Sequence, residues 1–451
     1  MGQPTPSRGL YIATFGCQMN VYDSDRMAGL LAPLGFELVD DPEHAELILI
    51  NTCSVRRSAE HKVYSYLGQL KELKGRRGRL LIGLGGCLAQ QEGQRLLDQV
   101  PHLDLVFGTG VIHRLPELIA EAAAGRRRAL TELDGPAAAA PLPIPPRPGI
   151  KAHLTVMRGC DNFCAYCVVP HTRGREHSRP ADEVAAEAAA LCAAGVREIT
   201  LLGQNVNSYA DPGGGDFADL LARLADTPGL WRLRFVTSHP KDLSDRLVEA
   251  MASQERVMEQ IHLPAQSGSD RVLKAMNRRY SRRQYLDKVS RLRRRVEGLA
   301  LGGDIIVGFP GETPQDFQAT MSLLETVRYD YLFSFKYSDR PFTRAAKMNG
   351  KLSEDIKARR LAELQARQRE ISLETHRGLV GRVLEVLVEG PAKHGQGLVA
   401  GRSRCGRMVN FTGGPDLIGR VVRVRITEGR VNSLVGRLNQ EEVQRHDTND
   451  R

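Results

Sequence analysis

Short apolar runs alternate with amphipathic stretches through the first quarter of the chain. The runs are LYIATF, AELILINT, RLLIGLGG and LDLVFGT, and helical patterns such as DSDRMAGLLAPLG lie between them. Apolar runs of this length, each followed by a helical pattern, are typical of strands buried in a mostly parallel sheet. Residues 9–122 therefore predict a small α/β domain.

The hydrophobic pattern stops at 123–149, where AAAAPLPIPPRPG is rich in alanine and proline. Such a composition cannot build a packed core, so this segment is predicted to be a linker.

A strand-then-helix rhythm repeats six times in the second block, 150–376. The candidate strands are HLTVMRG, REITLLGQN, RLRFVTS, EQIHLP, GGDIIVGFP and DYLFSFKYS. Successive units of this kind predict a parallel barrel, complete or partial, with its active face at the C-terminal ends of the strands.

The third block, 378–440, follows a long charged helix predicted at about 353–376. Its short runs alternate apolar and polar residues between glycine turns, which predicts a small antiparallel β-barrel. The block holds ten Lys and Arg against four Asp and Glu. The residues after it, 441–451, are predicted to be a disordered tail.

Composition and charge indicate what kind of partner this α/β protein binds and in which compartment it works. The formal net charge of +10 favours a polyanionic partner, although a solvated basic surface would give the same number. We expect no membrane segment, because no run approaches the ~20 apolar residues that a membrane helix needs. No secretory signal pattern is present at the N-terminus, so we expect a cytoplasmic protein whose eight cysteines are reduced.

Three of these cysteines lie within eight residues of one another, in the stretch GCDNFCAYC directly after a predicted strand. Cys160, Cys164 and Cys167 could hold three irons of a cubane cluster from one loop, leaving the fourth iron open. Disulfides are disfavoured in a reducing compartment. A zinc site with His171 as fourth ligand remains an alternative, although its spacing differs from the paired C-x2-C of zinc ribbons.

A second set of cysteines is dispersed. Cys17, Cys53 and Cys87 each follow one of the first three candidate strands. The carboxyl ends of parallel strands border one crevice, so three thiols there could converge on a second cluster. Three unrelated buried cysteines are the alternative. Cys192 lies in a helical pattern and Cys405 in a turn-like stretch, and neither is assigned a role.

The first motif, C-x3-C-x2-C with Tyr166 before its last cysteine, resembles the radical S-adenosylmethionine superfamily. The resemblance implies that the open iron binds S-adenosylmethionine. It also implies that one electron cleaves this cofactor to methionine and a 5′-deoxyadenosyl radical, which abstracts hydrogen from an unactivated carbon.

The motifs GCQMNVYDSDRM, NTCSVRRSAEHKV and GCLAQ resemble the N-terminal domain of the methylthiotransferase family within that superfamily. The resemblance covers about residues 9–440. It implies that Cys17, Cys53 and Cys87 ligate an auxiliary [4Fe-4S] cluster, which delivers sulfur that a second S-adenosylmethionine methylates.

The motifs NTCSVR and GQNVNSY are similar to those of the branch that acts on dimethylallyladenosine in tRNA. This implies a transferase that methylthiolates carbon 2 of the modified adenosine next to the anticodon, at position 37. The sister branches act on threonylcarbamoyladenosine in tRNA or on an aspartate of a ribosomal protein, and these are the alternatives.

The resemblance also implies cofactor contacts and partners. We expect S-adenosylmethionine contacts at strand ends, and the candidates are Gln204, Ser238, Gln266 and Glu312. The alternative is that such residues pack at the top of the barrel or cap helices, as Ser269 could. The third block resembles the RNA-binding TRAM module. The implied partners are tRNA, an electron donor such as flavodoxin or ferredoxin, and sulfur-supplying proteins, and we expect a monomer.

Two further expectations concern single segments. Arg173, Arg175 and Arg179 either extend a basic track to the active site or pair with Glu176 and Asp182. The segment YSDRPFTRAA departs from the family pattern YSxRPGTPA, with Phe342 and Arg344 in place of glycine and proline, so we expect altered turn chemistry there.

Overall fold

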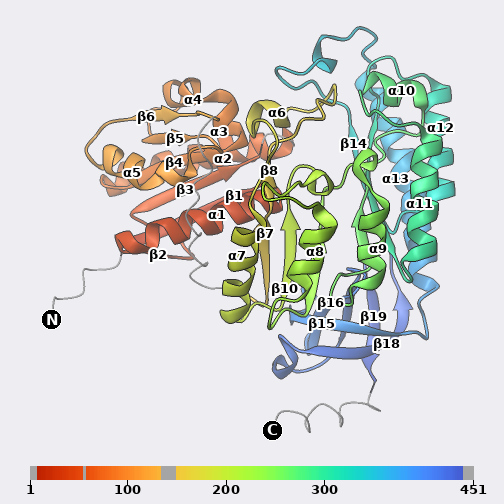
Figure 1. Cartoon of the computed structure of the whole chain (residues 1–451). Coiled ribbons are helices and arrows are strands. Elements are labelled where there is room, and N and C mark those ends of the chain that lie inside the picture. The colour runs from red at the N-terminus through yellow and green to blue at the C-terminus, as the bar shows by residue number, and fades with distance from the viewer. Residues whose placement is uncertain (1–7, 54–56, 134–148, 440–451) are drawn as a thin grey trace. The chain divides into compact units, whose positions relative to one another are not determined.

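The computed structural model describes residues 8–53, 57–133 and 149–439. The tail predicted at 441–451 and the linker residues 134–148 lie outside these ranges. The chain forms two compact units, coloured along the sequence in Figure 1. The first comprises Met1–Phe163, Cys167–Gly215 and Thr227–Gly229, and the second comprises Cys164–Tyr166, Asp216–Asp226 and Leu230–Arg451.

A six-stranded sheet of order β2-β1-β3-β4-β5-β6 forms the core of the first unit, and all of its strand pairs are parallel. Its strands are β1 Arg8–Phe15, β2 Phe36–Leu38, β3 Leu47–Thr52, β4 Leu81–Gly86, β5 Leu105–Phe107 and β6 Arg128–Leu130. Its helices are α1 Gln18–Leu31, α2 Arg57–Arg77, α3 Cys87–Glu92, α4 Gln94–Gln99 and α5 Leu115–Ala123. The parallel α/β arrangement is confirmed. The segment predicted as a linker, 123–149, contains β6, which pairs with β5.

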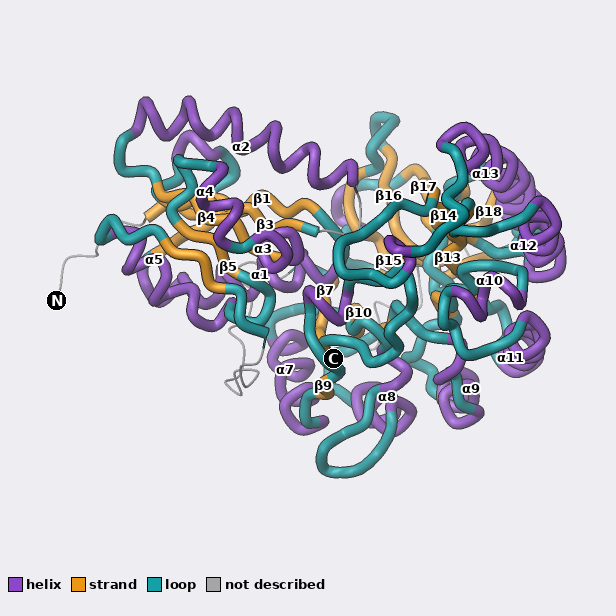
Figure 2. Tube along the Cα trace, turned by 90° about the horizontal axis from the view of Figure 1, so that it is seen from above, coloured by secondary structure: helices purple, strands orange, loops and turns teal. Residues whose placement is uncertain are grey.

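Helices cover both faces of this sheet, which explains why its central strand is apolar throughout. Every residue of β3 is buried. Leu47 and Leu49 pack in one cluster with residues of α1 and α5, whereas Ile48 and Ile50 pack in another with residues of α2. Figure 2 shows α2 running along one side of the strands. Successive strand residues point to opposite faces, so a doubly covered strand needs apolar residues at every position.

The first unit continues into the second block with one strand–helix–strand unit. Strands β7, Lys151–Thr155, and β10, Glu198–Leu202, pair in parallel, and α7, Ala181–Ala193, connects them. A short antiparallel pair, β8 Met157–Arg158 with β9 His177–Ser178, and helix α6, Val169–Thr172, lie in the connection before α7.

The second unit repeats the same rhythm. Strands β12, β13 and β14 form a parallel sheet. The strands are β11 Arg232–Phe235, β12 Gln260–His262, β13 Ala300–Val307 and β14 Tyr331–Lys336. The helices are α8 Phe217–Ala225, α9 Asp245–Ser253, α10 Asp270–Ala275, α11 Arg282–Arg295, α12 Pro314–Val327 and α13 Glu354–Arg377. Each of the six candidate strands of the second block forms at its predicted place.

The third block is a closed barrel of order β15-β16-β17-β19-β18. Its strands are β15 Val383–Pro391, β16 Leu398–Ser403, β17 Met408–Thr412, β18 Val421–Gly429 and β19 Leu434–Leu438. The predicted small barrel is confirmed, but it is not antiparallel throughout, since β17 and β19 pair in parallel. Alternate apolar residues such as Val386, Val409, Phe411 and Ile426 fill the interior.

Arginine side chains attach this small barrel to the starts of the strands in the second unit. Arg232, the first residue of β11, donates to the backbone oxygen of Arg402 at 2.7 Å and to Glu385 at 2.9 Å. Glu259, just before β12, pairs with Arg404 at 2.6 Å, and Asp330, just before β14, pairs with Arg407. The small barrel therefore lies at the end of these strands opposite their carboxyl ends.

Two local features complete the description. Phe342 has a φ of +67°, a left-handed conformation that glycine would adopt without strain, and its side chain is 65% exposed. No helix within the described ranges is both long enough and apolar enough to span a bilayer.

Candidate active site

Three cysteines lie at one edge of the six-stranded sheet. Cys17 comes two residues after β1, and Cys53 and Cys87 come one residue after β3 and β4. The register places Phe15 opposite Thr52 and Thr52 opposite Gly86, and the three strands are neighbours. Adjacent strands are about 4.8 Å apart, so the three cysteines follow level positions on consecutive strands.

Buried amide and hydroxyl groups hold the loops that carry these cysteines. Asn20 donates to the Asn51 side chain at 2.9 Å and to the backbone oxygen of Thr52 at 3.1 Å. Asn51 in turn donates to the backbone oxygen of Asn20 at 2.8 Å, and Thr52 donates to that of Gly85 at 2.7 Å. The backbone N–H of Cys17 donates to Asn20 at 3.2 Å. These bonds join the three loops into one frame, because buried polar groups are stable only when they are paired.

A buried ion pair places an arginine beside these cysteines. Arg173 donates to Asp23 at 2.9 Å, and the two side chains are 7% and 5% exposed. The Arg173 guanidinium interacts electrostatically with Cys17 and with Cys87. A hydrogen bond from Cys53 and the charge of Arg173 outweigh burial and lower the pKa of Cys17 to about 6. The thiolate is the form that binds metal, and a lowered pKa favours it.

The cysteines of the C-x3-C-x2-C motif divide between the two units. Cys160 and Cys167 belong to the first unit, where the backbone N–H of Cys160 donates to the Gly174 oxygen at 3.3 Å. Gly159 has a φ of +73°, and a Cβ there would lie 1.9 Å from the Arg175 oxygen, so only glycine fits before the first cysteine. Cys164 belongs to the second unit, where Arg278 donates to its Sγ at 3.4 Å.

Among the described residues, no group of three or more His, Cys, Asp or Glu side chains is arranged to hold a metal ion. A cubane cluster attaches each thiolate to a different iron, so its ligands lie farther apart than those of one ion. The level positions of Cys17, Cys53 and Cys87 fit such a cluster.

The four candidate cofactor contacts fall into two groups. Ser238 and Gln266 are 3% and 7% exposed, and Ser238 Oγ and Gln266 Oε1 have no hydrogen-bond partner among the described residues. A buried polar atom without a partner is costly, so both atoms are available to bind a ligand. Thr237 and Gln266 also have left-handed backbones, with φ of 67° and 72°.

The other two candidates already have protein partners. Gln204 accepts a hydrogen bond from the backbone N–H of Gly159. Glu312 forms a buried ion pair with Arg360 and accepts from the Gly308 N–H at 2.9 Å. These contacts use Gln204 Oε1 and Glu312 Oε1, and the assignment of both residues to S-adenosylmethionine stays a prediction. Ser269, considered as a helix cap, does cap α10 by accepting from the Val272 N–H at 3.4 Å.

The arginines after the first motif are paired, but with other carboxylates than Glu176 and Asp182. Arg173 pairs with Asp23, Arg175 with Asp161 at 2.7 Å, and Arg179 with Glu187 at 2.8 Å. A basic track running through all three is wrong, because Arg173 is buried. Sequence reasoning missed Asp23 and Asn20 as functional residues, although both lie within the GCQMNVYDSDRM motif.

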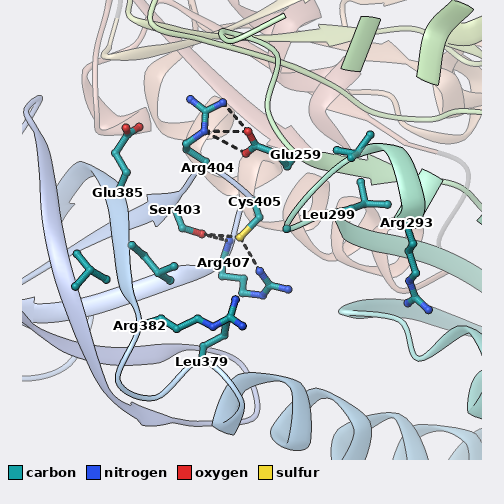
Figure 3. A pocket seen from close by; sticks show the side chains of 14 residues that line it. Glu259, Arg293, Leu299, Leu379, Arg382, Glu385, Ser403, Arg404, Cys405 and Arg407 are labelled. Atoms are coloured by element: carbon teal, nitrogen blue, oxygen red, sulfur yellow. Dashed lines mark hydrogen bonds and ion pairs between the residues drawn. The ribbon is translucent and has the colours of Figure 1, made fainter. Parts of the chain in front are cut away.

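The two remaining cysteines have separate surroundings. Cys192 is buried in α7. Cys405 lines a cavity of about 580 Å³ in the second unit, where its Sγ lies 2.6 Å from Arg407 Nη1 and 3.2 Å from Ser403 Oγ (Figure 3). None of the ten candidate site residues lines this cavity.

Comparison with known proteins agrees with this geometry. Residues 9–108 match the family described as "Uncharacterized protein family UPF0004", residues 154–324 match the radical SAM superfamily, and residues 377–438 match the TRAM domain. A solved structure of the radical S-adenosylmethionine methyltransferase TsrM from Kitasatospora setae aligns with a TM-score of 0.55 at 16% identity, over 75% of each chain. The fold and the cysteine motif are those of a radical S-adenosylmethionine enzyme with a TRAM domain.

Curated relatives define the family more closely. The tRNA-2-methylthio-N(6)-dimethylallyladenosine synthase of Geobacter metallireducens is 51% identical over 96% of this chain and 99% of its own length. That of Syntrophotalea carbinolica is 48% identical over 95% of this chain and 99% of its own. The chain belongs to the family of tRNA-2-methylthio-N(6)-dimethylallyladenosine synthases.

The buried ion pair beside Cys17 predicts a large effect of a small substitution. Asp23→Asn leaves the Arg173 charge uncompensated, which should lower the free energy of unfolding by about 3–5 kcal/mol. The matched control is Asp161→Asn, whose pair with Arg175 is exposed and should contribute about 1 kcal/mol or less. Denaturant unfolding of the full-length variants measures both, and equal effects would contradict the assignment.

The environment of Cys17 predicts its reactivity in the iron-free protein. The thiolate is the reactive form and the pKa is lowered, so alkylation of Cys17 should reach half its maximal rate near pH 6. Cys53→Ala removes the hydrogen bond and should move this midpoint upward, toward the ordinary thiol range. Mass spectrometry of the Cys17 peptide follows the reaction. A midpoint above about pH 8 in the wild-type chain would refute the expected thiolate.

Proposed function

We propose that this enzyme methylthiolates carbon 2 of N6-dimethylallyladenosine in tRNA, next to the anticodon at position 37. Two observations together support the proposal. The chain carries two cysteine triads, and it is 51% identical, over 96% of its length, to a tRNA-2-methylthio-N(6)-dimethylallyladenosine synthase. Replacing an aromatic C–H by a methylthio group needs a radical, because no side chain can be tuned to remove such a proton.

The two triads have different tasks in this proposal. Cys160, Cys164 and Cys167 ligate three irons of one [4Fe-4S] cluster, and Cys17, Cys53 and Cys87 ligate the other. When bound, the first cluster with S-adenosylmethionine supplies the hydrogen-abstracting radical, and the second supplies sulfur that another S-adenosylmethionine methylates.

Other residues position these groups. The unpartnered atoms of Ser238 and Gln266 bind and orient S-adenosylmethionine at the carboxyl ends of β11 and β12. The Asn20, Asn51 and Thr52 hydrogen bonds fix the loops of the sulfur-donating triad. The Arg173–Asp23 pair stabilises thiolates there without adding net charge.

The small C-terminal barrel is suited to bind the tRNA backbone. Arg423 and Arg425 are exposed on β18, where they alternate with buried Val424 and Ile426. Arg425 also lies directly opposite Arg437 of β19, which is exposed as well. Like charges opposite each other destabilise a sheet, and phosphates bound across them remove the repulsion.

The bound tRNA must reach both ends of the second unit. The small barrel contacts the starts of the strands, whereas Ser238 and Gln266 lie at their carboxyl ends. The eight residues of β13 span about 26 Å, which sets the scale of this separation. A tRNA is long enough to be held on the barrel while its anticodon loop enters the active site.

Two further partners follow from the chemistry. Reductive cleavage of S-adenosylmethionine consumes an electron, so we include a flavodoxin or ferredoxin as donor. Each product carries away one sulfur, so sulfur-supplying proteins must restore the donor. The tRNA substrate implies that the enzyme works in the cytoplasm.

Nucleoside mass spectrometry of tRNA tests this function in cells. A strain lacking the protein should accumulate N6-dimethylallyladenosine without its 2-methylthio derivative. Wild type and the matched control Cys192→Ala should restore the derivative, and Cys53→Ala and Cys160→Ala should not. A normal level of the derivative in the deletion strain refutes the proposal. Loss of the methylthio group from threonylcarbamoyladenosine would favour the sister branch.

A further inference from the structure

A buried arginine lies against one cysteine of the radical motif. Arg278 follows α10 and is 4% exposed. It donates to the Pro264 backbone oxygen at 2.9 Å and to the Tyr280 hydroxyl at 3.0 Å. Its Nη1 lies 3.4 Å from Cys164 Sγ and 3.5 Å from the Tyr166 hydroxyl. The guanidinium thus reaches the cluster motif from a segment more than a hundred residues away.

No carboxylate among the described residues pairs with Arg278. Its hydrogen-bond partners in the described part of the chain are a backbone oxygen, two hydroxyls and the Cys164 sulfur. By contrast, buried Arg173 pairs with Asp23 and buried Arg360 with Glu312. A buried cation without a counter-ion is strongly unfavourable, so the site requires an anion that binds next to Cys164.

The backbone around Arg278 is held in an unusual conformation. Asn277 and Arg279, on either side of it, both have a φ of 59°. Asparagine adopts this left-handed conformation readily, whereas an arginine in it is strained. Tyr280 is anchored by its hydroxyl, which donates to the Ala265 oxygen at 2.7 Å. The chain therefore holds a left-handed residue on each side of Arg278 and keeps its guanidinium directed inward.

We propose that Arg278 is the buried counter-charge of the cluster held by Cys160, Cys164 and Cys167, and that it raises the reduction potential of this cluster. The inference rests on the proposed function, since it requires that these cysteines bind the cluster. A cluster held by three thiolates is anionic and gains one further negative charge when the donor's electron arrives. A fixed cation in a water-poor site stabilises the reduced state more than the oxidised state, and a hydrogen bond to a ligand sulfur acts in the same direction.

Arg278 is a positioning residue, because it acts on the reduction potential of the cluster through Cys164 and is not itself a ligand. Its role is distinct from that of Arg173 at the other triad. The Arg173 charge is neutralised by Asp23, whereas the Arg278 charge is available to the cluster that must accept an electron.

The test is an EPR-monitored redox titration of the reconstituted full-length holoenzyme. The signal that changes when S-adenosylmethionine is added identifies the relevant cluster. Arg278→Gln should lower the ratio of reduced to oxidised cluster at a fixed potential about tenfold, which is about 59 mV for a one-electron couple. Arg278→Lys keeps the charge and should retain most of the wild-type potential. Arg279→Gln is the matched control, because it removes an exposed charge from the same strained segment and should leave the potential unchanged.

Each outcome decides the question. A fully loaded Arg278→Gln with the wild-type potential overturns the inference. If Arg278→Gln loses iron, a loaded Arg278→Lys with near wild-type potential supports it, and loss of iron from both variants overturns it in favour of a purely structural bond to Pro264. If the wild-type protein shows no signal that responds to S-adenosylmethionine, the proposed cluster itself is wrong, which is a different failure.

Discussion

The hydrogen bonds among Asn20, Asn51 and Thr52 are the constraint on which the first half of the site depends. Three loops leave three neighbouring strands, and without cross-links each would set its cysteine independently. The side chains of Asn20 and Asn51 instead bond to each other and to backbone atoms of adjacent loops. Because β3 is covered by helices on both faces, these polar groups are sealed from water and their geometry is strongly specified. The positions of Cys17, Cys53 and Cys87 follow from this frame.

Charge distinguishes the two halves of the chemistry. Each triad includes a cysteine that interacts with a buried arginine, Arg173 in the first unit and Arg278 in the second. Asp23 neutralises Arg173, so that pair fixes thiolates with little effect on net charge. Arg278 lacks such a partner among the described residues and lies where an electron has to arrive. The same residue type thus serves sulfur delivery at one triad and reduction at the other.

Much of the architecture was predictable because its signals are local. The alternation of apolar runs and helical patterns predicted the parallel sheet and six strands of the second block, but not the two-residue strand β9. The C-x3-C-x2-C spacing predicted a cluster from one loop. The residues that support these cysteines were not predictable, because they are distant in sequence. Asp23 meets Arg173 across 150 residues, and Arg278 meets Cys164 across 114.

Two further features also depend on contacts between residues distant in sequence. Glu312 follows β13, as a ligand-binding residue would, and it forms a buried ion pair with Arg360 of α13. The β17–β19 pair is parallel because barrel closure, rather than chain order, decides which strands become neighbours. The hydrophobic pattern alone predicts the helices and strands. The long-range polar contacts determine which residues at the strand ends remain available to bind a ligand.

Iron counting with Mössbauer spectroscopy on anaerobically reconstituted full-length protein shows whether the six cysteines form two independent cluster sites on one chain. Wild type should hold about eight irons per chain in two [4Fe-4S] clusters, and Cys53→Ala and Cys164→Ala should each hold about four. Retention of about eight irons by either variant would refute the assignment of the two triads to separate clusters.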